Sequence, residues 1–272
     1  MLLRRHAELS RYVAQMGVLA AWEREIAKPR NADPKRLTRY GYKVYSQNDE
    51  DGIIAEVFRR IGVTGRSFVE FGVETGVESN TIKLLVEGWR GLWIEASPTS
   101  VARIAETLAP FITDGALAVR ESLITAENID GLIRDGGLGG EIDLLSIDID
   151  YNDYWVWKAI HAINPRVVVI EYNATLRPPL SLVVPYRSDG QWDGSNFYGA
   201  SLEALVRLGA DKGYRIVGCC LAGVNAFFVR QDLCGGHFLE PATAHEHYEP
   251  PRHFLYLLPS GHLPRPGPFE AV

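Results

Sequence analysis

Short apolar runs alternate with amphipathic stretches through the middle of the chain. The runs at 67–71, 91–94, 116–123, 142–147 and 167–170 are rich in valine, isoleucine and leucine and have the length of buried strands. Between them, apolar residues recur at intervals of three and four, which predicts helices. A repeated alternation of strand and helix is typical of crossover units, so the pattern predicts a parallel sheet with helices on both faces.

The pattern changes after the fifth run. Residues 174–199 contain repeated proline and glycine and predict an irregular loop that is long enough to be functional. Two later apolar runs, at 215–218 and 224–229, flank Ala222 and Gly223 and predict a strand pair joined as a hairpin. The fold class that we predict is therefore α/β, with a mostly parallel, doubly wound sheet and a C-terminal antiparallel strand pair.

The same pattern divides the chain into three segments. Residues 1–48 are helical at first and then polar and basic, and we interpret them as an N-terminal helical cap or lid. Residues 49–232 hold the alternating strands and helices and form the main domain. Residues 233–272 are rich in proline, glycine and histidine, and we expect them to form a C-terminal tail that is draped over the domain or partly disordered.

Composition restricts the class of protein. The 272 residues include 28 Lys+Arg against 34 Asp+Glu, and the resulting net charge of −6 argues against a nucleic-acid partner. The longest apolar runs are too short to span a membrane, and three cysteines are too few for a disulfide scaffold. We expect a cytoplasmic protein with no membrane partner. Its oligomeric state stays open, and a homo-oligomer is one of the alternatives.

The turn after the first strand and the end of the second strand predict a nucleoside site. Gly72 can make the tight turn, and Gly76 can let the chain approach a ligand and start a helix. Glu95 ends the next strand, where a carboxylate can accept both hydrogen bonds from a ribose diol. Each feature alone is more often an ordinary turn or surface residue. Together, on consecutive strand ends, they favour a nucleoside.

The charge of this turn indicates which nucleoside. A dinucleotide site normally has a third glycine, so that a pyrophosphate can lie at the helix N-terminus, and that glycine is missing here. Glu74 and Glu78 line the turn instead and would repel a pyrophosphate while tolerating a cation. The sequence therefore favours a cationic, phosphate-free cofactor over a dehydrogenase cofactor.

These motifs resemble class I S-adenosylmethionine-dependent methyltransferases, and more narrowly the FkbM-type family. The resemblance covers about residues 45–230 and rests on the segments at 68–72, 91–98, 143–150 and 225–229. Two features depart from the family pattern: the family often has Asp and Asn where this chain has Glu70 and Glu74, and Asp-Val-Glu-Gly where it has 148–151.

The resemblance implies a Rossmann-like methyltransferase fold and S-adenosylmethionine as the cofactor. It places Glu70, Gly72 and Gly76 at the amino-acid end of the cofactor and Glu95 at the ribose. Ser122 would lie near the adenine, and Gln47 would reach in from the N-terminal segment. The full set of expected cofactor-binding residues is Gln47, Glu70, Gly72, Glu74, Gly76, Glu95, Ser122 and Asp148.

An acidic cluster follows the fourth and fifth strands. Asp148, Asp150 and Asp153 come after the fourth strand, and Glu171 and Asn173 come after the fifth. Several carboxylates in one crevice repel each other unless a cation binds, and oxygen ligands select a hard ion such as Mg²⁺, Mn²⁺ or Ca²⁺. The arrangement is similar to that of catechol-type O-methyltransferases, although Tyr172 separates the last pair. We expect Asp150, Glu171 and Asn173 to be the metal ligands.

A metal-free interpretation stays open beside this one. Asp148 would then hold the cofactor or accept backbone hydrogen bonds, Asp153 would cap the next helix, and Glu171 would be the general base. In either case, the candidate catalytic residues are Asp150, Glu171 and Asp153.

The function that the sequence favours is methyl transfer from S-adenosylmethionine to a hydroxyl group of a small molecule, such as a sugar or natural product. An N- or carboxyl-directed methyltransferase of the same fold is one alternative. A non-enzymatic nucleotide-binding or assembly module is another. In the enzyme, we expect the N-terminal helix and the loop at 174–199 to cover the acceptor site.

Overall fold

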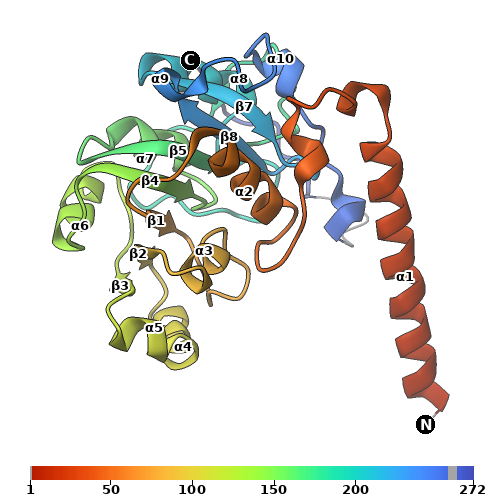
Figure 1. Cartoon of the computed structure of the whole chain (residues 1–272), viewed down its shortest axis with the longest axis horizontal. Coiled ribbons are helices and arrows are strands. Elements are labelled where there is room, and N and C mark those ends of the chain that lie inside the picture. Colours follow the sequence, from red (N-terminus) through yellow and green to blue (C-terminus); the bar gives the residue numbers. More distant parts are fainter. Residues whose placement is uncertain (1, 257–261) are drawn as a thin grey trace.

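The computed structural model describes residues 2–256 and 262–272, and its centre is a seven-stranded sheet (Figure 1). The strand order is β3-β2-β1-β4-β5-β8-β7. β1 to β5 are parallel, whereas β8 is antiparallel to both β5 and β7. This Rossmann-like α/β architecture, with its C-terminal antiparallel pair, confirms the predicted fold class. The strands are β1 (Ser67–Phe71), β2 (Arg90–Glu95), β3 (Leu117–Glu121), β4 (Gly140–Ile147), β5 (Ile163–Glu171), β7 (Tyr214–Cys219) and β8 (Asn225–Arg230).

Helices cover both faces of this sheet, because the side chains of its buried strands alternate between two apolar clusters. Val168 belongs to one cluster, while its neighbours Val167 and Val169 belong to the other. The Val168 face is covered by α6 (Ile129–Asp135), α7 (Asp153–Ala159) and α8 (Leu202–Asp211). The opposite face is covered by α2 (Glu50–Ile61), α3 (Ile82–Val86), α4 (Pro98–Thr107) and α5 (Ala109–Thr113).

Two helix starts show how the sequence fixes these elements locally. Ser97 precedes α4 and Ser201 precedes α8, and each hydroxyl accepts a hydrogen bond at 3.3 Å from the backbone N–H three residues later. Pro98 fills the first position of α4, where a missing N–H costs nothing. The first of these starts fixes the chain just after Glu95.

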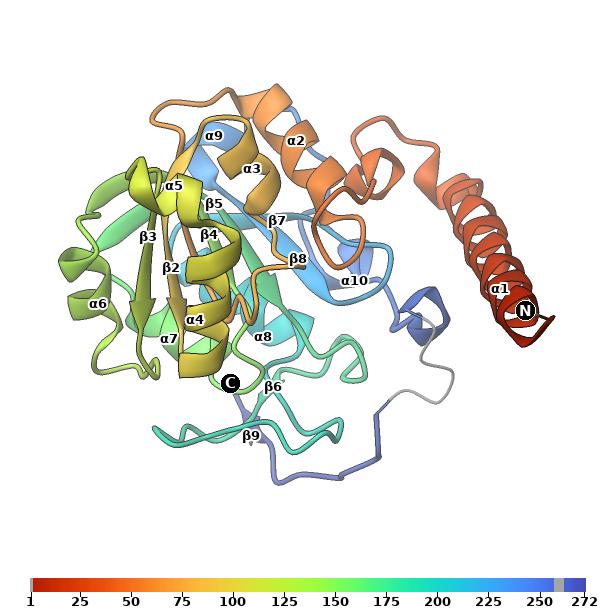
Figure 2. The same ribbon diagram turned by 90° about the horizontal axis from the view of Figure 1, so that it is seen from below.

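The N-terminal segment extends away from the sheet. α1 (Leu2–Ile26) runs outward in both views, and two short 3-10 turns, Pro29–Asn31 and Leu37–Tyr40, lead back to α2 (Figure 1, Figure 2). Among the described residues, no helix combines the length and the apolar character that a bilayer crossing requires.

The segment after β8 returns to the carboxyl ends of the strands. It contains α9 (Gln231–Cys234), α10 (Ala244–His247) and a 3-10 turn at His253–Tyr256. Near its end, β9 (Glu270–Ala271) pairs antiparallel with β6 (Leu182–Val183), which lies in the loop at 174–199 (Figure 2).

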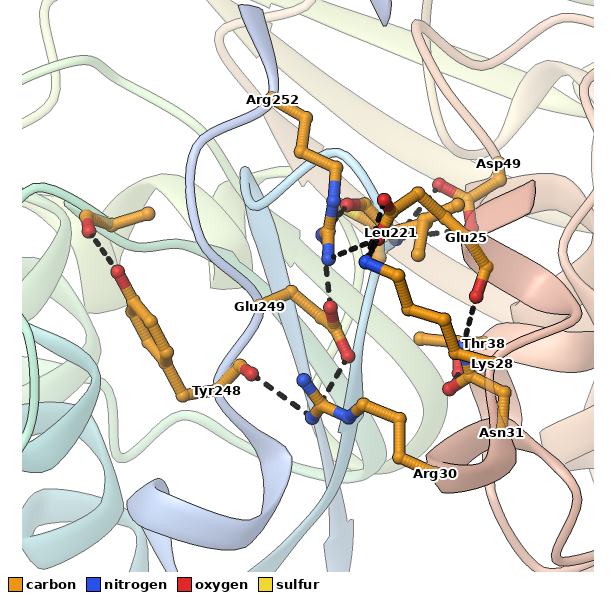
Figure 3. A network of polar contacts seen from close by, with 12 residues as sticks. Glu25, Lys28, Arg30, Asn31, Thr38, Asp49, Leu221, Tyr248, Glu249 and Arg252 are labelled. Carbon is orange, nitrogen blue, oxygen red and sulfur yellow. Dashed lines mark hydrogen bonds and ion pairs between the residues drawn. The ribbon is translucent and has the colours of Figure 1, made fainter. Parts of the chain in front are cut away.

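Ion pairs hold this C-terminal segment against the N-terminal one (Figure 3). The Arg252 guanidinium lies 2.9 Å from Glu249 and 3.0 Å from Glu25, and Arg30 lies 3.1 Å from Glu249. Arg252 also donates to the backbone oxygen of Leu221 in the β7–β8 turn. Because Glu249 and Arg252 are buried, these contacts fix the backbone on both sides of residue 251.

Candidate functional site

Two adjoining cavities lie beyond the carboxyl ends of the strands. The first, of about 320 Å³, is called the Glu95 cavity here, and the second, of about 400 Å³, the carboxylate cavity. Both volumes lie in the range of small-molecule sites. The two cavities share Gly72, Glu74, Asp148, Asp150 and Trp192, so they are parts of one cleft.

Glu95 is held rigidly at the end of β2. Its Oε2 accepts a hydrogen bond from the Glu74 N–H, and its Oε1 accepts one from the Ser97 N–H, both at 2.8 Å. Each carboxylate oxygen keeps acceptor capacity toward the Glu95 cavity, which it lines. The arrangement can accept two hydrogen bonds from a vicinal diol, as the sequence predicts for the ribose.

Gly72 makes the turn after β1 with a positive φ of 69°. A Cβ at this position would meet the backbone oxygen of Asp148 at 1.6 Å, so the β1 and β4 ends approach each other too closely for any side chain. Of the three non-glycine residues with positive φ among those described, two, Glu74 and Asp150, line both cavities. The unusual backbone is therefore concentrated at this cleft.

Gly76 has a different role from the expected one. It lines neither cavity, and a Cβ there would lie 2.7 Å from the ring of Trp93. The helix also begins later than predicted, at Ile82. Gly76 thus allows the turn to pack on the indole of Trp93 rather than to approach a ligand.

Apart from the acidic residues that it shares with the carboxylate cavity, the remaining walls of the Glu95 cavity are apolar or uncharged. Ile94, Leu123 and Ile124 line it, together with Ser122, whose hydroxyl donates to the Leu123 backbone oxygen at 3.2 Å. This is a suitable environment for a flat, uncharged heterocycle such as adenine. Ser122 thus lines the cavity, and its proximity to an adenine stays a prediction.

Glu70 is buried in the carboxylate cavity by a dense hydrogen-bond network. Its carboxylate accepts from the backbone N–H groups of Asn80 at 2.7 Å and Thr81 at 3.1 Å, from the Thr81 hydroxyl at 2.5 Å and from the Ser146 hydroxyl at 3.3 Å. Burial raises the pKa of Glu70 to about 7, although these hydrogen bonds favour the charged form. A cationic ligand group would stabilise the carboxylate further.

Several polar atoms of this cavity have no hydrogen-bond partner in the described chain. The Ser79 hydroxyl and the Asn225 side-chain oxygen are unpartnered, and their residues are only 4% and 3% exposed. The buried Glu171 Oε2 also lacks a partner. Because unpartnered buried polar atoms are costly, the cavity is prepared for a polar ligand. Gln47, exposed on the N-terminal side, lines the same cavity.

Three carboxylates converge where the two cavities meet. Carboxylate oxygens of Asp148, Asp150 and Glu171 all lie within 4.8 Å of one another. Burial and the neighbouring charges of Asp150 and Asp153 raise the pKa of Asp148 well above its ordinary value. Burial and the charges of Asp148, Asp153 and Asp150 do the same to Glu171. This trio can hold protons or a hard divalent cation, and its donor set fits such an ion.

The structure does not bring Asn173 and Asp153 to this trio as cavity-lining groups. The Asn173 amide donates to the backbone oxygens of Asn196 and Tyr198, and its oxygen accepts from Thr175, so it is fully used inside the loop. Asp153 accepts from the Ile149 N–H at 2.9 Å and lines neither cavity. Asp148 therefore takes the place that we predicted for Asn173, and Asp153 stabilises the turn before α7.

Aromatic and histidine side chains that the sequence analysis missed form the outer wall. Trp192, Tyr198, His253 and His262 line the carboxylate cavity. The His262 ring contacts the other three, with ring centroids 5.0 Å from Trp192, 5.7 Å from Tyr198 and 5.4 Å from His253. Residues of the loop at 174–199 thus line the cleft, whereas none of the described side chains of α1 lines either cavity.

Comparisons with known proteins find structures but no sequence relatives. No protein-family model matches the chain, and no curated protein matches it. Similar solved structures include an S-adenosylmethionine-dependent methyltransferase from Clostridium acetobutylicum, with 13% identity over 69% of this chain and 92% of that one and a TM-score of 0.41. Precorrin-6y C5,15-methyltransferase from Geobacter metallireducens has 15% identity over 70% and 92%, with a TM-score of 0.42.

A third structure contains a bound cofactor. The glycopeptide N-methyltransferase MtfA in complex with S-adenosylmethionine has 13% identity over 69% of this chain and 96% of that one, with a TM-score of 0.42. At these identities and scores, the likenesses do not assign an activity or a subfamily to this chain.

Proposed function

We propose that this chain is an S-adenosylmethionine-dependent methyltransferase that methylates a hydroxyl group of a small molecule. The observation that carries the proposal is the fixed Glu95 carboxylate at a cavity whose other described walls are apolar, uncharged or acidic and hold no cationic group for a phosphate. Among the described residues, neither cavity is lined by a lysine or an arginine. A dinucleotide would leave its pyrophosphate facing carboxylates, whereas a sulfonium nucleoside carries the opposite charge.

In this proposal, different residues bind different parts of the cofactor. Glu95 holds the ribose diol, and Ile94, Leu123 and Ile124 enclose the adenine with Ser122 at its edge. Glu70, Glu74 and Asp148 supply negative charge around the sulfonium and ammonium groups. Ser79, Asn225 and Gln47 are the uncharged groups of the carboxylate cavity that can bond the amino-acid end.

Methyl transfer breaks the bond between sulfur and the methyl carbon and forms a bond from the acceptor oxygen to that carbon. The acceptor must therefore lie in line with the breaking bond, and orientation supplies much of the rate. Trp192, Tyr198 and the two histidines wall the side from which an acceptor would approach. The hydroxyl proton passes to a carboxylate of the trio, for which Glu171 is our candidate because its raised pKa makes it a better base.

Asp148, Asp150 and Glu171 are also the residues that would hold a divalent cation, Mg²⁺ in the first instance. A bound cation would lower the pKa of a coordinated hydroxyl. In the chain itself, the three carboxylates then keep their charges, because the cation removes their mutual repulsion. Our proposal includes activation of the acceptor hydroxyl by the cation. If the cation is not required, Glu171 acts as the general base without it.

Calorimetry with S-adenosylhomocysteine tests the cofactor. We expect the wild-type chain to bind it and Gly72→Ala to lose binding, because the new Cβ would displace the Asp148 backbone. Gly115→Ala is the matched control: its φ of 72° is similar, but a Cβ there meets nothing within 4 Å. If the chain bound NADH and gave no binding heat with S-adenosylhomocysteine, the proposal would be wrong.

Metal dependence needs a separate experiment. Chelation with EDTA should remove methyl transfer, and Mg²⁺ or Mn²⁺ should restore it. Asp150→Asn and Glu171→Gln should lose turnover while retaining S-adenosylhomocysteine, and titration of Mg²⁺ into each variant should show no bound ion. Full activity after exhaustive chelation would exclude the cation and leave Glu171 as the base.

A further inference from the structure

α1 carries an apolar stripe that no other described part of the chain covers. Leu9, Tyr12, Val13, Met16 and Leu19 are between 46% and 62% exposed. They recur at intervals of three and four, which places them on one face of the helix. An ordinary surface helix turns such a face toward its own protein, so the exposure of this stripe requires an explanation.

The body of the protein contacts the opposite face of the same helix. Val18, Ala21, Trp22 and Glu25 are partly buried and also follow helical spacing, on the side away from the stripe. Glu25 is bonded to Lys28 and to Arg252, which fixes the end of α1 to the C-terminal segment (Figure 3). Because α1 is anchored by this other face, the stripe points away from the domain.

The stripe lies in a stretch without charge. From Tyr12 to Trp22 there is no acidic or basic residue, although 23% of the chain is charged. A helix that carries no charge over three turns is usually covered by other protein on more than one side. A second helix could therefore pack here without opposing like charges.

We propose that the stripe is the dimerisation surface of this protein and that α1 of a second copy occupies it in antiparallel orientation. The spacing suits packing of side chains between two helices. Covering the stripes of two copies would remove on the order of 1,000 Å² from water, which is the lower limit for a specific interface.

The antiparallel orientation follows from where α1 is anchored. The C-terminal end of α1 is fixed to its own domain through Glu25 and Arg252, so an antiparallel pair puts the two domains at opposite ends of the paired helices. We centre the pair on residues 14 and 15, near the middle of the stripe. A membrane surface fits less well, because such helices carry lysine and arginine along a polar face, and residues 12–22 have none.

Sedimentation velocity over a range of protein concentrations tests the dimer. The molar mass obtained for the wild-type protein should be twice that of one chain. The double variant Leu9→Glu with Met16→Glu should have the molar mass of a monomer. Ala14→Glu is the control, because it places an added negative charge on the opposite face of α1, where residue 14 is exposed, and the single Met16→Glu variant matches its charge. Since all three positions are exposed, S-adenosylhomocysteine binding should be the same in every variant, which verifies folding.

Cross-linking tests the orientation. The three native cysteines are buried, so introduced cysteines on α1 will react selectively. Oxidation of a mixture of Val13→Cys and Met16→Cys chains should give the mixed cross-linked dimer, because these positions face each other in the antiparallel pair. Predominant cross-linking of Val13→Cys to itself would overturn that orientation.

Two results would overturn the proposal as a whole. One is a wild-type monomer at all concentrations. The other is a dimer that persists in the double glutamate variant. Flotation of the monomeric wild-type chain with phosphatidylcholine and phosphatidylglycerol vesicles, abolished by Leu9→Glu with Met16→Glu, would assign the stripe to a membrane surface instead.

Discussion

The Glu95 cavity and the carboxylate cavity adjoin each other, yet they are built from different parts of the chain. The Glu95 cavity consists largely of the ends of β1, β2, β3 and β4 and the turns that directly follow them. The carboxylate cavity adds Gln47, Tyr198, the β7–β8 turn, and Pro251, His253 and His262 from the C-terminal segment. The first is thus a product of the sheet itself, and the second is assembled from segments that are distant in the sequence.

This difference indicates how the two halves of the cleft can vary. A wall made of strand ends cannot change without disturbing the sheet, which suits a cofactor that many enzymes share. A wall made of loops and a C-terminal segment can change with little effect on the core, which suits an acceptor that differs between enzymes. Three predictions test whether the two cavities behave independently.

The largest effect is expected in the Glu95 cavity. Glu95→Ala should weaken S-adenosylhomocysteine binding by at least about 100-fold, because it removes two hydrogen bonds to a charged acceptor. Glu121→Ala is the matched control: Glu121 pairs with Glu95 in register at the end of β3, but it is exposed and lines neither cavity. Equal losses in both variants would mean that general acidity, not Glu95, recognises the cofactor.

An intermediate effect is expected in the loop that both cavities share. Arg187 is exposed, and its backbone oxygen accepts a hydrogen bond at 2.6 Å from Asn152, which lines the Glu95 cavity. S-adenosylhomocysteine should therefore slow tryptic cleavage after Arg187 by on the order of tenfold through local stabilisation. Cleavage after the exposed Arg24 in α1 is the internal control. An unchanged rate at Arg187 would assign the loop to the acceptor side alone.

The smallest effect is a dependence of stability on pH that originates around the carboxylate cavity. Burial raises the pKa of Glu70 to about 7 in the folded chain, so the folded state holds a proton that the unfolded chain releases. This stabilisation is complete below the unfolded pKa and is lost as the pH rises through about 7. The ligand-free protein should therefore melt at a higher temperature at pH 6.5 than at pH 8.5.

Glu70→Gln should remove part of this dependence, about 1 kcal/mol between pH 6.5 and 8.5. Glu127→Gln should not, because a hydrogen bond from Tyr186 lowers the pKa of Glu127. His247, whose pKa burial lowers to about 4, adds an opposite and smaller dependence near pH 6.5, but it does so equally in the wild type and in Glu70→Gln and cancels in their comparison. Identical melting profiles for the wild type and Glu70→Gln would contradict the origin that we assign.

Much of the fold could be predicted, because buried strands and amphipathic helices each follow from a local period. The rule that ligands bind beyond the carboxyl ends of parallel strands also identified five residues that the structure brings to one cleft: Gly72, Glu95, Asp148, Asp150 and Glu171. It gave the wrong role to Gly76 and the wrong position to Asn173. In both cases the residue follows a strand end, but a contact outside the local sequence, with Trp93 or with the loop at 196–198, decides where it points.

The outer wall could not be predicted at all. Trp192, Tyr198, His253 and His262 lie in irregular segments without a hydrophobic period, and nothing local shows that they meet. Pairing of β6 with β9 and the buried ion pairs of Arg252 bring these segments together. A signal for them would have to come from contacts between distant segments, which composition and periodicity do not record.

The anchoring of residues 249–252 by Arg30 and Glu25 also has a consequence for biosynthesis. A ribosome makes every strand of the large sheet before it makes these residues, so the sheet and the Glu95 cavity can form while the carboxylate cavity still lacks its outer side. The N-terminal partners of the ion pairs are made first, so Arg30 and Glu25 lack their contacts with Glu249 and Arg252 until the C-terminal segment is made. Under the proposed function, the half of the cleft that we assign to the cofactor can therefore form before the half that we assign to the acceptor.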